Sequence, residues 1–136
     1  MLERLKVAGA ETRIWPTQFG FKSKSGTSDA LFVVRRLLDQ VWETSDGTVI
    51  MLTLDWAKAF DSISPIALLN TLQRFGVPRA FRNIVGSIYL NCRFFVSELN
   101  TQSQDHLQYF GISQGYPLSS FLFIILMTVL MTDAKE

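Results

Sequence analysis

The chain has few of the residues on which several common sites are built. Cys92 is the single cysteine and His106 the single histidine among 136 residues. No intrachain disulfide can form, and no Cys/His cluster exists that could hold zinc. The chain also lacks a P-loop and a G-x-S-x-G nucleophile motif. This scarcity of cysteine favours a reducing, intracellular setting.

Targeting segments, repeats and linkers are also missing. Residues 1–13 show no apolar stretch followed by a small-residue cleavage site, so no signal peptide is expected. The most apolar run, 121–131, is shorter than the roughly 20 residues that a bilayer requires and predicts a buried core helix. We therefore expect one domain in the nucleus or cytoplasm, without a membrane and without an obligate protein partner. Residues 132–136 follow directly on the apolar run, which suggests an incomplete segment.

Apolar residues are plentiful, at 48% of the chain, while charged residues make up 18%. This composition can fill a core and argues against disorder. The net charge of +1 gives no general attraction to nucleic acid. A local basic face and a scatter of unrelated surface arginines both stay open for Arg35, Arg36, Arg74, Arg79, Arg82 and Arg93.

Four helices are predicted from apolar spacing and from start and stop signals. Residues 29–43 have an amphipathic pattern, with Thr27 or Ser28 as the N-cap and Asp29 in the first turn. Ser64 and Pro65 start a second helix, which Gly76 ends. The others span 79–90 and 118–132. The expected buried residues of the second and third helices are Leu68, Leu69, Leu72, Phe75, Phe81, Ile84, Val85 and Ile88.

Three strands are predicted. Residues 48–55 are short, apolar and β-branched, which is typical of a strand buried on both faces. Residues 92–98 and 106–112 flank a polar loop and predict a hairpin. The order predicts an α+β fold with helices packed on a small, mainly antiparallel sheet.

Two carboxylates lie six positions apart in "DWAKAFDSI", residues 55–63. Asp55 ends the predicted strand, where it could bind Mg²⁺ or merely cap the following turn. Asp61 precedes the second helix and is expected to accept hydrogen bonds from its first backbone N–H groups. Phe60 either packs near a nucleotide sugar or fills the core.

Two further segments could contact phosphate or sugar groups. In "GISQGYPLSS", residues 111–120, Gln114 offers an amide, Gly115 frees the backbone and Pro117 starts a helix. Lys22 and Lys24 lie on a glycine-containing loop, as a phosphate contact or as solvated side chains. An isolated Gln-Gly pair is most often a turn.

Taken in order, "QFGFKSKSGTSDAL", "LTLDWAKAFDSI" and "GISQGYPLSSFLFIILM" resemble the reverse transcriptase domain of non-LTR retrotransposons and of the related group II intron type. The resemblance covers roughly residues 18–132. It implies a partial fingers–palm region of a polymerase right hand over 1–136. It also implies Mg²⁺ in the complete domain, with an RNA template, a DNA primer and deoxynucleotide triphosphates as partners.

The resemblance also implies roles for individual residues. Asp55 matches the first catalytic carboxylate and Mg²⁺ ligand, and Phe60 matches the aromatic steric gate against a ribose 2′-OH. Gln114 and Gly115 match the nucleotide pocket. Three more residues match template or phosphate contacts, namely Lys22, Pro117 and Ser119. The loop "SKSGTS" and Tyr116 depart from the family pattern.

The family's aromatic-x-Asp-Asp hairpin and thumb are not found in this sequence. Asp133 lies in "MTDAKE" and lacks that pattern. Because the two-metal reaction needs carboxylates from two segments, the chain alone is expected to be inactive. The competing hypothesis is a non-catalytic retroelement remnant that binds RNA or acts as a scaffold.

Overall fold

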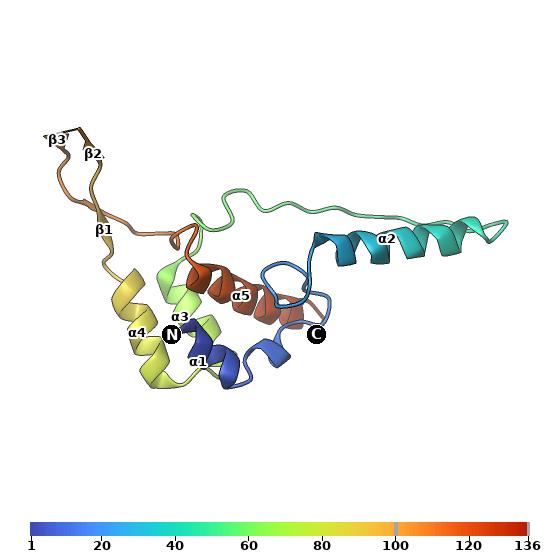
Figure 1. Ribbon diagram of the computed structural model, residues 1–136, viewed down its shortest axis with the longest axis horizontal. Helices are drawn as coiled ribbons and strands as arrows, with labels where there is room; N and C mark the ends of the chain where they lie inside the picture. Colours follow the sequence, from blue (N-terminus) through green and yellow to red (C-terminus); the bar gives the residue numbers. More distant parts are fainter. Residues whose placement is uncertain (100, 136) are drawn as a thin grey trace.

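A computed structural model describes residues 1–99 and 101–135. Four helices form a packed body: α1 (Leu2–Val7), α3 (Pro65–Arg74), α4 (Arg79–Tyr89) and α5 (Pro117–Lys135). A short 3-10 helix, η1 (Glu11–Arg13), follows α1. Helix α2 (Thr27–Trp42) projects from one side of the body, and a thin hairpin projects from the other (Figure 1).

The core is helical and is centred on α5. Helix α5 packs against α3 and α1, and α3 packs against α4. Leu68 and Leu72 of α3 are fully buried, as are Leu122, Ile124 and Ile125 of α5. Helix α1 was not predicted, although its Leu5 is buried in this core. The expected packing of helices on a sheet is therefore wrong, because the helices pack on one another.

The start and stop signals of α3 are confirmed. The Ser64 hydroxyl accepts a hydrogen bond from the Ala67 N–H at 3.5 Å, and Pro65 occupies the first helical position. Phe75 is buried, and Gly76 has a φ of +87° directly after the helix.

The buried face of α4 differs from the prediction. Val85 is buried and Phe81 is partly buried, as expected, but Ile84 and Ile88 are exposed. Tyr89 takes the place expected for Ile88: its ring is buried and its hydroxyl lies 2.8 Å from the Ser119 hydroxyl. Neither aliphatic residue could supply this polar contact inside the core.

The projecting hairpin contains all strands of the described residues. β1 (Arg93–Phe94) pairs antiparallel with β4 (His106–Leu107), and β2 (Ser97–Glu98) pairs with β3 (Thr101–Gln102). The predicted hairpin is confirmed, but its strands are two residues long and 108–112 is not a strand. The chain is thus mixed α and antiparallel β, in agreement with the α+β class.

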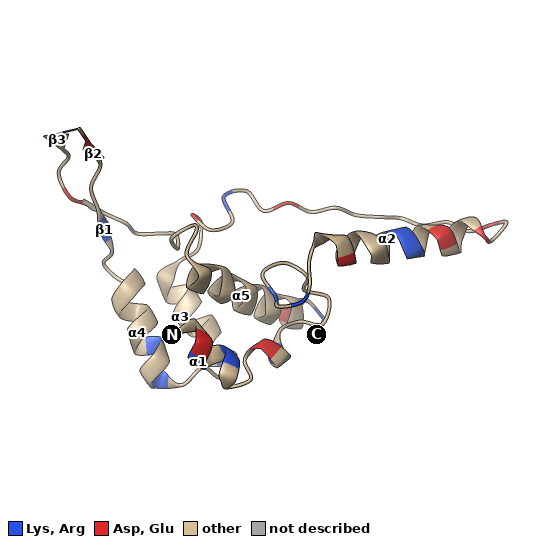
Figure 2. Ribbon diagram, viewed as in Figure 1, with Lys and Arg blue, Asp and Glu red and all other residues tan. Residues whose placement is uncertain are grey.

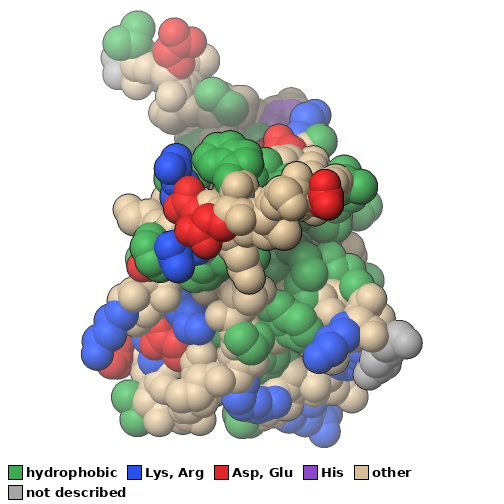
Figure 3. All heavy atoms as spheres, turned by 90° about the vertical axis from the view of Figure 1, so that its right-hand side faces the viewer, with side chains coloured by type: hydrophobic (Ala, Val, Ile, Leu, Met, Phe, Trp, Pro, Cys, Tyr) green, Lys and Arg blue, Asp and Glu red, His purple; other side chains and the backbone are tan. Residues whose placement is uncertain are grey.

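The remaining projection, here called the arm, consists of α2 and residues 43–58. Helix α2 has the predicted extent within a few residues, but its N-cap is Gly26, whose N–H donates to the Asp29 carboxylate at 2.7 Å. No residue of α2 is buried. Seen from its tip, the arm presents apolar side chains beside acidic and basic ones (Figure 3).

Residues 48–55 are not the buried strand that their composition predicts. They form an extended, exposed segment that returns from the arm towards the body (Figure 1), and Ile50 is 91% exposed. A strand buried on both faces requires neighbouring strands and covering helices. Among the described residues, no strand pairs with residues 48–55.

Helix α5 has the length and apolar composition of a membrane span, which is weak evidence because core helices share these properties. Its first half lies at the centre of the core, where Phe121, Leu122, Ile124 and Ile125 are almost fully buried. This burial agrees with the predicted core helix.

Candidate functional site

The candidate site is the junction between residues 60–63 and 111–115, two segments about 50 residues apart in the sequence. The Ile112 N–H donates to the Phe60 carbonyl at 3.0 Å, and the Gly111 N–H donates to the Ile63 carbonyl at 2.8 Å. Gly111 has a φ of +97°, and a Cβ there would lie 3.2 Å from the Asp61 backbone. Only glycine permits this close approach without strain.

Side chains reinforce this junction. The Gln114 amide Nε2 donates to Asp61 Oδ1 at 3.0 Å. Asp61 thus bonds across the junction, and Ser64 rather than Asp61 caps α3. The expectation that Asp61 caps this helix is therefore wrong. The bond leaves the Gln114 side-chain carbonyl oxygen available as an acceptor, while Gly115, with a φ of +82°, turns the chain towards Pro117 at the start of α5.

Phe60 belongs to a cluster of three aromatic rings. Its ring stacks on Phe123 of α5 with centroids 4.8 Å apart, and Phe21 approaches its edge at 6.1 Å. Phe60 is half-buried and packs against the core. The cluster therefore connects the loop around residue 21 to the junction. The sequence had suggested only core filling as a structural role for Phe60.

Asp55 lies outside this junction, in the exposed segment that leads from the arm. Its Oδ1 accepts a hydrogen bond from the neighbouring Trp56 N–H at 2.9 Å. Among the described residues, no group of three or more Asp, Glu, His or Cys side chains could hold a metal ion. One carboxylate can hold a single Mg²⁺ together with waters and substrate phosphates, but a two-metal centre needs ligands from more than one segment. The described residues therefore do not by themselves fit a two-metal Mg²⁺ site.

Lys22 lies on a loop that is attached to the N-terminal region. The Ser23 N–H donates to Glu11 Oε1 at 2.7 Å, and Lys6 Nζ donates to the Ser23 hydroxyl at 3.3 Å. Hydrogen bonds from the Ser23 side chain and backbone lower the pKa of Glu11, and the charges of Lys6 and Lys22 add to this effect. Lys22 is half-buried near Glu11 and Phe21 is next to it in sequence, so the loop is held close to the aromatic cluster.

Ser119, expected as a template or phosphate contact, lies inside the core in this structure. It is fully buried, and its hydroxyl is hydrogen-bonded to Tyr89. In this structure its hydroxyl is unavailable to a phosphate, because α5 turns that side inward. Pro117, two residues earlier, is exposed at the start of α5.

The family model and the individual relatives that match this chain agree with one another. The family model described as reverse transcriptase (RNA-dependent DNA polymerase) matches residues 1–136. The chain is 30% identical over 116 residues to the Pol polyprotein of the type-2 retrotransposable element R2DM of Drosophila melanogaster. It is 32% identical over 83 residues to that of the type-1 retrotransposable element R2 of Nasonia vitripennis.

These matches cover 85% and 61% of this chain, but only 11% and 8% of the two polyproteins. The chain thus spans about a tenth of the length of the curated relatives that it matches. No solved structure matches it significantly.

Proposed function

Because this chain belongs to the reverse transcriptase (RNA-dependent DNA polymerase) family, we propose that it forms the nucleotide-pocket part of a retrotransposon polymerase that copies RNA into DNA. The observation that carries this proposal is the junction between residues 60–63 and 111–115. Two backbone hydrogen bonds and the Asp61–Gln114 bond bring Phe60 and the Gln-Gly pair to one place. The two motifs lie far apart in the sequence, and a nucleotide pocket requires that they meet.

Each side chain of the pocket has a proposed task. Phe60, fixed between Phe21 and Phe123, excludes a ribose 2′-OH by its bulk. The Gln114 amide, held by Asp61, and the Gly115 backbone border the incoming nucleotide. Lys22 on its loop and Pro117 at the start of α5 face template or phosphate groups. A rigid ring is suited to the first task because its position cannot relax away from the sugar.

Asp55 is proposed as one carboxylate of the catalytic centre. Two-metal phosphoryl transfer requires several oxygen ligands from more than one segment. The described residues hold no such cluster, so we assign further ligands to other segments of the larger polypeptide. A strand of that polypeptide paired with residues 48–55 would bury the segment and fix Asp55 in place.

Primer extension on an RNA template with Mg²⁺ tests this proposal. We expect synthesis by a longer polypeptide that contains this chain, no synthesis by the 136-residue chain, and loss of synthesis in Asp55→Ala. Robust synthesis by the 136 residues alone would refute the need for further ligands. An active longer polypeptide that kept its rate after Asp55→Ala would refute the site.

Phe60→Ala tests the pocket separately. In the active longer polypeptide, we expect ribonucleotide incorporation relative to deoxyribonucleotide incorporation to rise by at least about tenfold. Phe32→Ala, at an exposed ring of α2 outside the three-ring cluster, is the matched control and should leave this ratio unchanged. An unchanged ratio in Phe60→Ala would refute the steric role of Phe60, and the ring would then contribute to packing only.

The non-catalytic remnant is the competing function. It predicts that no longer product of the same reading frame synthesises DNA, although the chain folds and binds RNA. The same primer extension assay, together with the coding sequence downstream of Glu136, separates the two. An aromatic-x-Asp-Asp motif within a few tens of codons would support the enzyme.

A further inference from the structure

One long stretch of the chain, which includes α3 and α4, carries no acidic residue. Residues 62–97 contain four arginines, at positions 74, 79, 82 and 93, and no Asp, Glu or Lys. The net charge of these 36 residues is thus +4, although the whole chain carries only +1. Figure 2 shows α4 with basic segments and no acidic one. Arg74 pairs with Asp133, so the positive charge on α4 itself comes from Arg79 and Arg82.

A hollow of about 420 Å³ runs along α4. Its lining combines the apolar side chains of Leu69 and Leu90 with the polar ones of Arg82, Asn83, Ser87 and Asn91. Arg82 is anchored by a hydrogen bond from Nη1 to the Gln73 side-chain oxygen at 2.5 Å. Its Nε is buried and has no hydrogen-bond partner. The Gln73 bond fixes the guanidinium within the lining of the hollow, where it offers a positive charge to a phosphate.

Gly86 forms the floor of this hollow. Glycine within a helix costs about 1 kcal/mol relative to alanine. A Cβ at this position would meet only Leu69 and Leu90, at an ordinary 3.5 Å. Alanine would therefore fit at this position, whereas a larger side chain would narrow the hollow.

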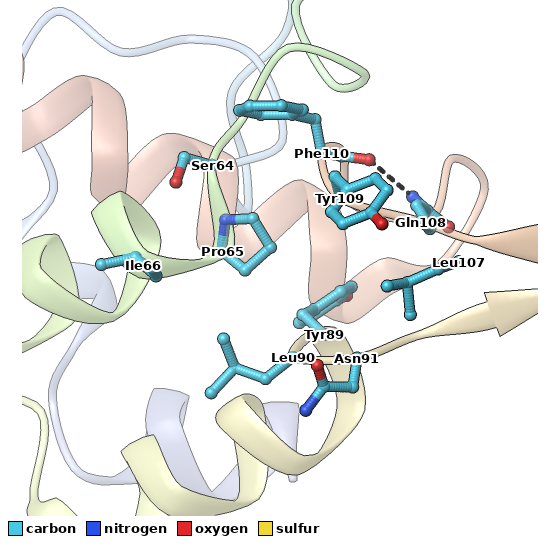
Figure 4. Close-up of a pocket in the computed structure, with 10 residues that line it drawn as sticks. All are labelled: Ser64, Pro65, Ile66, Tyr89, Leu90, Asn91, Leu107, Gln108, Tyr109 and Phe110. Carbon is cyan, nitrogen blue, oxygen red and sulfur yellow. Dashed lines mark hydrogen bonds between the residues drawn. The ribbon is translucent and has the colours of Figure 1, made fainter.

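A second hollow, of about 330 Å³, adjoins the first through Leu90 and Asn91, which line both. Tyr109 and Phe110 lie across it from these two residues, and Pro65 forms part of its wall (Figure 4). Tyr109 and Phe110 are 71% and 61% exposed. Exposed rings beside a cationic groove are the usual elements of single-strand recognition, because bases stack on the rings while the backbone follows the charge.

We propose that the two hollows form one groove that binds single-stranded nucleic acid outside the polymerase pocket. Arg82 and Asn83 bind the phosphate backbone, and the rings of Tyr109 and Phe110 stack with bases. The groove then carries a strand from the neighbourhood of the junction along α4. The choice of nucleic acid as the ligand rests on the proposed function. The location of the groove rests on the surface of α4.

The test measures fluorescence anisotropy of labelled oligonucleotides of about 15 nucleotides, with the 136-residue chain at low and moderate salt. We expect single-stranded RNA or DNA to bind more tightly than a duplex of the same length. Arg82→Gln should weaken binding by at least about fivefold and reduce the salt slope by about one. Tyr109→Ala should weaken it by about tenfold. RNA and DNA arms identify which strand the groove prefers, and either preference supports the groove.

Matched variants separate the groove from general charge and from misfolding. Arg36→Gln removes the same charge from α2 and should change affinity by less than about twofold. Gly86→Leu should block binding, whereas Gly86→Ala should keep most of it and stabilise α4. Circular dichroism of each variant shows whether the helices remain.

Three outcomes would overturn the proposal. They are equal losses in Arg82→Gln and Arg36→Gln, duplex binding as tight as single-strand binding, and equally strong competition by an acidic peptide of matched charge. Oligonucleotide binding needs no polymerisation, so its failure leaves the primer extension result intact. Likewise, Asp55→Ala should abolish synthesis by the longer polypeptide and leave groove binding unchanged.

Discussion

The body and the arm contain similar apolar helix patterns but use them differently. In the body, the apolar residues of α3 and α5 are buried against one another. In the arm, Leu31, Phe32 and Leu37 of α2 are more than half exposed, as are Ile50, Leu52 and Leu54 of the extended segment. Amphipathic spacing therefore shows which side of an element is suited to burial, and a partner must be present for burial to occur.

The difference also concerns the proposed site. Phe60 and Gln114 are attached to the body by backbone and side-chain hydrogen bonds, whereas Asp55 lies on the arm side of the junction. The proposed nucleotide pocket is thus supported by the body's own packing. The Asp55 carboxylate lies on the exposed segment 48–55, with which no strand pairs among the described residues.

The largest expected effect is the loss of stability when a buried leucine of the body is replaced by alanine. The same replacement at an exposed leucine of the arm is its comparison. Leu68→Ala removes a fully buried side chain of α3 and should lower the free energy of unfolding by about 2–5 kcal/mol. Leu37→Ala on α2 should change it by less than about 0.5 kcal/mol, because the side chain is 52% exposed. Urea denaturation followed by circular dichroism measures both, and equal losses would mean that the arm is packed in solution.

The sequence predicts local features of the fold correctly and misses features that depend on tertiary contacts. The cap of α3 and the hairpin depend on neighbouring residues and were predicted correctly. The strand at 48–55 was predicted wrongly, because β-branched apolar composition describes a suitable neighbour that only tertiary structure can supply. The roles of the site residues rest on motifs and stay a prediction. The Asp61–Gln114 bond was missed because spacing alone cannot pair two side chains 53 positions apart.

A second pair of substitutions compares two tyrosine hydroxyls. Tyr89→Phe removes the buried partner of the Ser119 hydroxyl and should lower the free energy of unfolding by about 1–2 kcal/mol. Tyr109→Phe removes an exposed hydroxyl and should have almost no effect. Thermal and urea unfolding of both variants tests this. If Ser119→Ala in the Tyr89→Phe background cost as much as in the wild type, the two hydroxyls would not be coupled.

A smaller effect is expected at the junction that joins arm and body. Asp61→Ala removes the acceptor of the Gln114 amide and should cost about 0.5–1 kcal/mol locally, because the pair is exposed. Hydrogen exchange of the Gly111 and Ile112 amides, which donate to Ile63 and Phe60, reports on the junction directly. Asp61→Asn keeps a side-chain oxygen and should retain most of the protection. Unchanged exchange in Asp61→Ala would show that the backbone bonds alone hold the junction.

The smallest expected effect is a pH dependence that distinguishes a body ion pair from an arm ion pair. Arg74 donates to the Asp133 carboxylate at 2.5 and 2.8 Å, and these hydrogen bonds lower the pKa of Asp133 below its ordinary value of 3.8. Since the lowered pKa belongs to the folded state, this contribution is present above the ordinary value and is lost as the pH falls through the lowered one. Asp133→Asn should therefore flatten the acid side of the stability curve slightly, since the pair is exposed. Asp39→Asn breaks the Arg35–Asp39 pair within α2. It should leave the curve of the body unchanged, and a comparable flattening there would show that the arm and the body unfold as one unit.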